Sequence, residues 1–201
     1  KTILICKVCQ LVKLFKNGQP YKMSKRAGDF ISVRELLNEV SKDSIRFMML
    51  NRSNDVELDF DFDKVLEKTR DNPVFYVQYC YARICSLFRT LKIDNNNNFN
   101  IDEKNFNLNE PELNLFRKIL DWPKVIEAAS NKFEPHRIPF YLYELAILFH
   151  AYWSKGNENP KYKFIVNDKI KNNNTLAIIK IVSLTIENGM KILGVKLPTK
   201  M

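Results

Sequence analysis

Apolar residues three and four positions apart recur over most of this 201-residue chain. Such spacing places them along one face of an α-helix, and a helix with one apolar face must bury it against another element. Together the stripes predict a mainly α fold, with a bundle of about four or five helices over residues 71–193. They comprise Val74, Val77, Tyr81, Ile84, Phe88 and Leu91; Ile138, Leu142, Leu145, Phe149 and Tyr152; and Ile179, Val182, Ile186, Met190 and Leu193.

Helix-start signals support this pattern. Asn72 is a good N-cap residue and Pro73 suits the first helical position, so the first long helix is expected to begin there. A shorter helix containing Leu113, Phe116 and Leu120 is expected to be disturbed near Pro123.

The first seventy residues have a different character. Two β-prone runs, Ile3–Cys6 and Leu11–Phe15, precede Asn17-Gly18, which predicts a strand, a tight turn and an extended return. Ser32 and Glu35 have the spacing of a capping box. A helix over residues 33–40, a second over residues 42–50, and an extended segment over residues 58–62 are therefore expected. The sequence predicts a short β-hairpin followed by connecting helices.

Composition limits the partners and the compartment. The net charge of +9 favours an anionic partner, and the chain lacks a run of about 20 uncharged apolar residues, which argues against a spanning helix. Four cysteines without a repeated framework suggest a reducing compartment, with the cytoplasm as the default. Cys6 and Cys9 have C-x-x-C spacing, but no second pair follows, so zinc is not expected. His136 and His150 lie in helical context and are interpreted as structural residues.

A basic segment, residues 22–30, carries three cations within five residues. Attack on the α-phosphate of ATP moves negative charge onto the departing pyrophosphate, and lysines on a loop can stabilise that charge as it develops. Lys22 and Lys25 are the candidate catalytic and ATP-binding residues, and Ser24 can donate a hydroxyl hydrogen bond. The alternative is a solvated basic loop.

The order Lys22-Met23-Ser24-Lys25 resembles the signature loop of class I aminoacyl-tRNA synthetases, and neighbouring segments are similar to the arginyl-tRNA synthetases in particular. Those segments are Gln10–Leu14, Asp29–Ser32, Ser44–Leu50, Asp71–Tyr79 with Ala82–Ile84, Glu134–Arg137, Phe149-His150, and Leu193–Val195 with Pro198 and Met201. The resemblance extends from about Gln10 to the last residue. It implies an enzyme that uses ATP, accompanied by Mg²⁺, to activate arginine and transfer it to tRNA.

The resemblance also implies a domain organisation. Residues 1–32 are expected to end a catalytic nucleotide-binding domain, residues 33–70 to form a connecting stem, and residues 71–201 to form a helical anticodon-binding domain. The H-x-G-H-type motif and the arginine pocket of the family are absent, and the chain does not begin with Met. The chain is therefore expected to need an upstream catalytic domain of the same polypeptide and to be inactive alone.

The partner implied by the resemblance is tRNA for arginine, with neither DNA nor membrane as a partner. Similarity to the family places Tyr79, Arg83, Tyr152 and Met201 near the anticodon arm. Aromatic rings can stack on unpaired bases, and cations attract the phosphate backbone. Tyr152 also belongs to an apolar stripe, so burial in the core is an equal alternative. A functional alternative is a non-catalytic, synthetase-like module for RNA binding or protein interaction.

Overall fold

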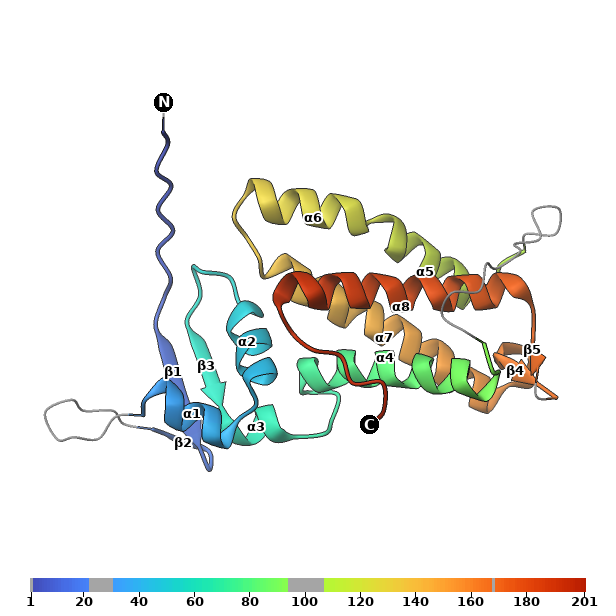
Figure 1. Cartoon of the computed structure of the whole chain (residues 1–201), viewed down its shortest axis with the longest axis horizontal. Helices are drawn as coiled ribbons and strands as arrows, with labels where there is room; N and C mark the ends of the chain where they lie inside the picture. Colours follow the sequence, from blue (N-terminus) through green and yellow to red (C-terminus); the bar gives the residue numbers. More distant parts are fainter. Residues whose placement is uncertain (1, 22–30, 94–106, 168) are drawn as a thin grey trace, which may run out of the picture.

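The computed structural model describes residues 2–21, 31–93, 107–167 and 169–201, and it combines a small sheet with a helical bundle. Figure 1 shows the sheet and its short helices at one end and the long helices at the other. The mainly α class predicted from the apolar stripes is confirmed. Lys22, Ser24 and Lys25 lie outside the described residues.

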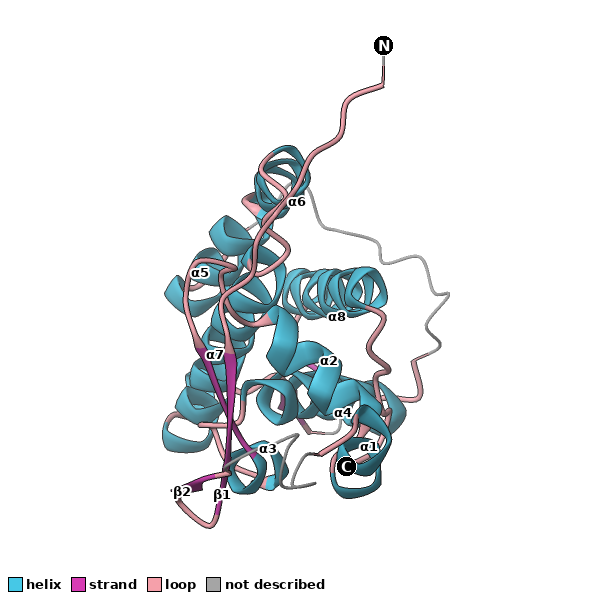
Figure 2. Cartoon of the chain, turned by 90° about the vertical axis from the view of Figure 1, so that its left-hand side faces the viewer, coloured by secondary structure: helices cyan, strands magenta, loops and turns pink. Residues whose placement is uncertain are grey.

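The sheet joins segments that are far apart in the sequence. Strand β1 (Val12–Lys16) pairs antiparallel with β2 (Gln19–Pro20) and parallel with β3 (Leu58–Asp61), with Val12 opposite Leu58. Asn17 and Gly18 make the turn between β1 and β2 with positive φ angles of 52° and 69°. Figure 2 shows the strands of this sheet, in magenta, at the end of the molecule that faces the viewer. The predicted turn and the extended segments on either side of it are confirmed, and the extended segment expected over residues 58–62 is observed as β3, except that Phe62 already begins the next helix.

The β-prone run Ile3–Cys6 forms no strand, and its side chains are exposed. Backbone groups of a strand need a hydrogen-bonding neighbour, and no strand of the described residues pairs with this run. This run therefore does not form a strand here despite its high β propensity.

Three short helices pack on the sheet. The helix α1 (Val33–Glu39) begins with the predicted capping box of Ser32 and Glu35, and α2 (Lys42–Leu50) follows with Ser41 as its cap. Helix α3 (Phe62–Leu66) continues directly from β3. Their small core contains Leu14, Leu36, Val40, Phe60, Phe62 and Val65.

The bundle consists of α4 (Pro73–Thr90), α5 (Glu110–Leu120), α6 (Trp122–Asn131), α7 (Arg137–Glu158) and α8 (Asn173–Leu193). Asn72 caps α4 as expected, and the break predicted near Pro123 falls between α5 and α6. A 3₁₀ turn (Pro160–Tyr162) and a short hairpin of β4 (Ile165–Val166) and β5 (Lys169–Ile170) lie between α7 and α8.

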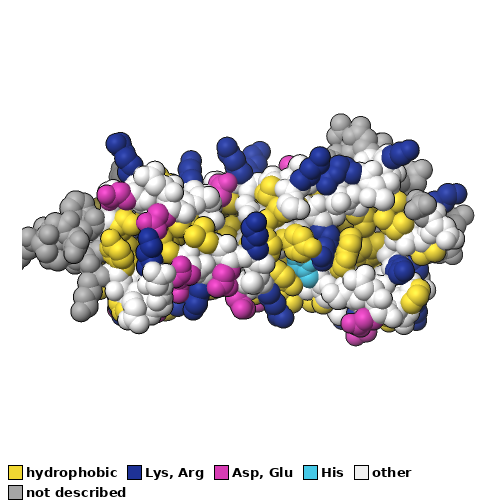
Figure 3. All heavy atoms as spheres, turned by 90° about the horizontal axis from the view of Figure 1, so that it is seen from below, with side chains coloured by type: hydrophobic (Ala, Val, Ile, Leu, Met, Phe, Trp, Pro, Cys, Tyr) yellow, Lys and Arg dark blue, Asp and Glu magenta, His cyan; other side chains and the backbone are white. Residues whose placement is uncertain are grey.

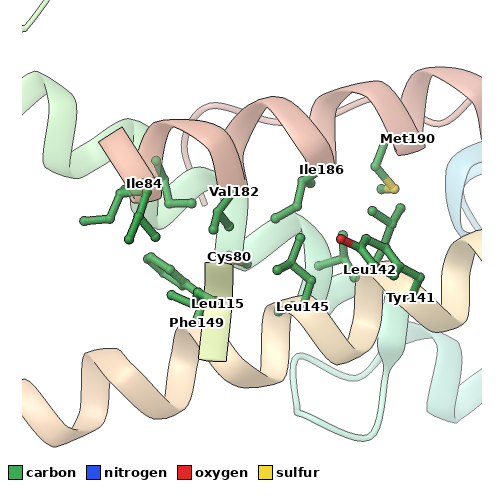
Figure 4. Close-up of a cluster of buried hydrophobic side chains, with 14 of the residues drawn as sticks. Cys80, Ile84, Leu115, Tyr141, Leu142, Leu145, Phe149, Val182, Ile186 and Met190 are labelled. Carbon is green, nitrogen blue, oxygen red and sulfur yellow. The ribbon is translucent and has the colours of Figure 1, made fainter. Parts of the chain in front are cut away.

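The apolar stripes meet in one core. Figure 4 shows side chains from α4, α5, α7 and α8 pointing toward one another, among them Ile84, Leu115, Leu145, Phe149 and Ile186. Helix α2 belongs to both cores, because Phe47 is fully buried in the bundle while Met48 and Met49 pack against the smaller core. This shared helix fixes the sheet to the bundle.

Candidate nucleic-acid interface

A pocket of about 490 Å³ lies where the C-terminal segment passes α4 and α7. Its lining consists of Tyr79, Ala82, Arg83, Ser86, Arg89, Trp153, Lys200 and Met201. Three of the residues expected near an anticodon arm, Tyr79, Arg83 and Met201, thus share one pocket, although Met201 is far from the other two in the sequence. Helix α4 provides Tyr79 and Arg83 one turn apart, and α7 provides Trp153.

Figure 3 views the molecule from the side on which α4 lies in Figure 1. Hydrophobic side chains and Lys or Arg side chains lie next to one another over the bundle, and most Asp and Glu side chains of this face lie toward the sheet end. A surface that alternates rings and cations can combine base stacking with attraction of phosphates.

The guanidinium of Arg83 is the best-defined polar group of the pocket. Its central carbon lies over two aromatic rings, 4.4 Å from the ring centroid of Tyr79 and 4.7 Å from that of Trp153. Its Nη2 donates to the Tyr79 hydroxyl at 2.5 Å, and its Nη1 lies 3.1 Å from Nδ1 of His150. Cation–π contacts and these hydrogen bonds hold the side chain in one place.

No carboxylate of the described residues forms an ion pair with Arg83. The partners of its guanidinium are rings, a phenol and an imidazole, all of them neutral. Within the described part of the chain this positive charge has no carboxylate partner, and it lies beside an open pocket, where an anionic or electron-rich ligand can pair with it.

The C-terminal segment forms one wall of the pocket and is tied to α4. Nε2 of Gln78 donates to the carbonyl of Lys196 at 2.9 Å, and Nη1 of Arg89 donates to the carbonyl of Thr199 at 2.9 Å. Met201 remains 56% exposed. The segment begins at Gly194, whose φ of 67° ends α8 in the left-handed conformation that favours glycine.

Tyr152 lies elsewhere, in the interior, and is 1% exposed. Its hydroxyl donates to Oε1 of the buried Glu112 at 2.8 Å and accepts from Nδ2 of Asn109 at 2.9 Å, and its ring contacts Phe164 edge-on. Burial raises the pKa of this phenol. A base could stack on the ring only if the ring left the core, so the structure corrects the expected anticodon contact: Tyr152 packs, and its neighbour Trp153 lines the pocket.

The sequence alone did not indicate that Trp153 and Arg89 line the pocket, nor that His150 contacts Arg83. The missed signal is helical geometry, because His150 and Trp153 are three apart on α7 and both contact Arg83. Among the described residues, no group of three or more His, Cys, Asp or Glu side chains is arranged to hold a metal ion. None of the helices in the described segments is long and apolar enough to cross a membrane.

The chain is similar in sequence to known proteins. Residues 77–201 match the family model of the DALR anticodon binding domain. The arginine–tRNA ligase of Pelagibacter ubique is 55% identical over 201 residues, which cover 100% of this chain and 35% of that protein. The arginine–tRNA ligase of Roseobacter denitrificans is 46% identical over 97% of this chain and 34% of its own length. The chain thus spans about a third of the length of the curated relatives it matches.

Solved structures give the same family. A Campylobacter jejuni crystal structure described as an arginyl-tRNA synthetase superposes with a TM-score of 0.81 at 30% identity, over 96% of this chain and 40% of that one. The Thermus thermophilus arginyl-tRNA synthetase, at 20% identity and a TM-score of 0.66, shares the fold. Since the family model covers more than half of the residues and includes every residue that lines the pocket, the chain belongs to the DALR anticodon binding domain family.

Proposed function

We propose that this chain is the C-terminal portion of an arginine–tRNA ligase and that its bundle binds the anticodon arm of tRNA for arginine. The pocket lined by Tyr79, Arg83, Trp153 and Met201 is the proposed binding site. The observation that carries the proposal is the guanidinium of Arg83, which has no carboxylate partner among the described residues and is held between rings beside an open pocket within the family-matched residues. Unpaired RNA bases and phosphates supply the acceptors and ring faces that such a pocket fits.

The remainder of the proposal concerns the longer protein. Residues 1–32 form the last part of its catalytic domain, and residues 71–201 form the RNA-binding domain. Residues 33–70 are the stem that connects the two. An upstream domain of the same polypeptide completes the ATP site, and the longer protein uses ATP with Mg²⁺ to activate arginine. Its proposed location is the cytoplasm. Lys22, Ser24 and Lys25 supply the ATP-contacting loop. The similarity to arginine–tRNA ligases along the whole chain supports these assignments.

Binding of tRNA tests the RNA-binding part. We expect Arg83→Ala to weaken binding of an arginine tRNA transcript by about 10- to 100-fold, because a hydrogen bond to a charged group contributes roughly 1.5–3 kcal/mol. Affinity should also fall with salt by roughly 0.7–0.9 log units per log unit for each phosphate contacted. Thr90→Ala on the same helix is the matched control, since its hydroxyl bonds only within α4. Equal affinity for duplex DNA, or no effect of Arg83→Ala, would contradict binding at this pocket.

Arginine-dependent pyrophosphate exchange tests the catalytic part in the longer protein that includes the upstream domain. Lys25→Ala should lower exchange about 100-fold while ATP binding changes little, because a donor to charge that develops in the transition state contributes about 3 kcal/mol. The 201-residue chain alone should show no exchange. Unchanged exchange in the variant would remove Lys25 from the reaction, and a longer protein without any exchange would favour the non-catalytic module.

A further inference from the structure

His150 is a buried titratable residue that lies behind the pocket and does not line it. Its side chain is on α7, is 5% exposed, and is packed against the rings of Tyr76 and Tyr79, with centroids 4.3 Å and 5.4 Å away. A histidine in a core needs partners for both ring nitrogens. Here one partner is the pocket arginine.

The two partners allow a single form of the ring. Arg83 can only donate a hydrogen bond, so Nδ1 of His150, 3.1 Å from its Nη1, must be unprotonated and accept. The backbone carbonyl of Tyr76 can only accept, so Nε2, 3.3 Å away, carries the proton and donates. Both contacts therefore select the neutral ring protonated at Nε2.

The surroundings favour the same neutral form. The titratable and charged groups that face His150 are Tyr76, Tyr79 and Arg83, all on α4. Burial and the adjacent guanidinium lower the pKa of His150 to about 4, while its bond to the Tyr76 carbonyl acts in the opposite direction. A proton on Nδ1 would replace the acceptor for Arg83 with a donor and add a like charge beside it.

The effect on Arg83 is to orient it without neutralising it. A carboxylate at this place would hold the guanidinium and cancel its charge, whereas an imidazole holds it and leaves the charge free. His150 and the Tyr79 hydroxyl engage one N–H on each terminal nitrogen, and the other N–H groups of Arg83 have no hydrogen-bond partner in the segments that the structure describes. Arg83 is thus fixed while it keeps donors for a ligand.

We propose that His150 is a positioning residue for RNA binding: its neutral ring, protonated at Nε2, holds the Arg83 guanidinium at the pocket wall and leaves its remaining N–H groups for acceptor atoms of the bound RNA. This inference rests on the proposed RNA-binding function of the pocket.

Three substitutions in the 201-residue chain separate the two hydrogen bonds of His150. His150→Asn keeps an acceptor at the position of Nδ1 and loses the donor to Tyr76. His150→Gln keeps a donor near the position of Nε2 and loses the acceptor for Arg83. His150→Leu loses both but retains apolar volume. Binding of an arginine tRNA transcript is measured for each variant at temperatures where circular dichroism shows it folded, together with its melting temperature.

We expect His150→Gln and His150→Leu to bind about tenfold more weakly than the native chain, and His150→Asn to remain within about threefold. The RNA affinity of each variant should depend on whether residue 150 still provides an acceptor for Arg83, and it should not correlate with the melting temperature. In the Arg83→Ala background the three substitutions should no longer change the affinity, because the group they position is gone. That loss of coupling is a readout that a purely structural histidine would not produce.

Equal loss for Asn, Gln and Leu, affinity that tracks stability alone, or effects that persist with Arg83→Ala would overturn the inference. If Arg83→Ala weakens binding while His150→Leu binds like the native chain, the inference fails and the proposed function stands. Native affinity in Arg83→Ala itself would remove this pocket as the RNA site, so both would fail.

Discussion

Tyr152 and Trp153 are adjacent on α7 and both contact the ring of Phe164, but their polar surroundings differ. Around Tyr152, the interior cluster places Glu112 so that donors reach both of its oxygens: the Tyr152 and Thr175 hydroxyls and the backbone N–H of Asn109. Around Trp153, no carboxylate of the described segments forms an ion pair with Arg83. The difference between the core and the binding site is therefore whether the buried polar groups find hydrogen-bond and charge partners within the protein.

Truncation of Tyr152 should give the largest effect. Tyr152→Ala is expected to cost about 3–5 kcal/mol of unfolding free energy, because it opens a cavity beside Phe164 and removes a donor from buried Glu112. Thermal or denaturant unfolding by circular dichroism measures it. Tyr152→Phe, which keeps the ring, should cost only about 1–2 kcal/mol. If Tyr152→Ala stayed as stable as the native chain yet lost RNA affinity, the division between the core and the binding site would be wrong.

The acid dependence of stability should come next. The folded-state pKa of His150 is lowered to about 4 from an ordinary value near 6.5, so between these values the unfolded chain binds the proton and the folded chain does not. Stability is therefore fully present above about pH 6.5 and falls as pH decreases toward 4, by about 3 kcal/mol in all. Denaturant unfolding at a series of pH values measures this slope.

His150→Asn is the control for that slope, since an amide does not titrate. Its stability should fall less steeply than that of the native chain over the same pH range. Parallel slopes for the two proteins would mean that the His150 ring can take up a proton in the folded state, and the neutral form argued from its two hydrogen bonds would be incorrect.

The long helices were predictable because their burial pattern is local. The apolar residues of α4, α7 and α8 recur at helical spacing, and the Asn72 cap marks the start of α4. The parallel pairing of β1 with β3 was not predictable, because it joins residues more than forty positions apart, such as Val12 and Leu58. The two-residue strands β4 and β5 carry too little periodicity to be recognised.

The pocket was predictable only in part, for a related reason. Family resemblance indicated Tyr79, Arg83 and Met201, but the place of Trp153 depends on how α7 packs against α4. Sequence periodicity assigns Tyr152 to the core stripe, and the structure follows that assignment in preference to the resemblance. His150 is assigned as structural by its helical context, and its contact with Arg83 appears only when the two helices are packed.

The smallest effect should come from the wall that the C-terminal segment adds to the pocket. Gln78→Ala removes the hydrogen bond to the Lys196 carbonyl, worth about 1 kcal/mol, and should weaken RNA affinity by roughly fivefold if the segment positions Met201 for the ligand. The melting temperature should hardly change, since Gln78 is outside the core. Hydrogen exchange of the backbone amides in residues 195–201 reports release of the segment directly. Gln78→Met, similar in size and neutral but without the donor, should behave like the Ala variant, and Thr90→Ala should not. Faster exchange with unaltered RNA affinity would show that the rings and Arg83 suffice, and that the segment covers the pocket without contributing to it.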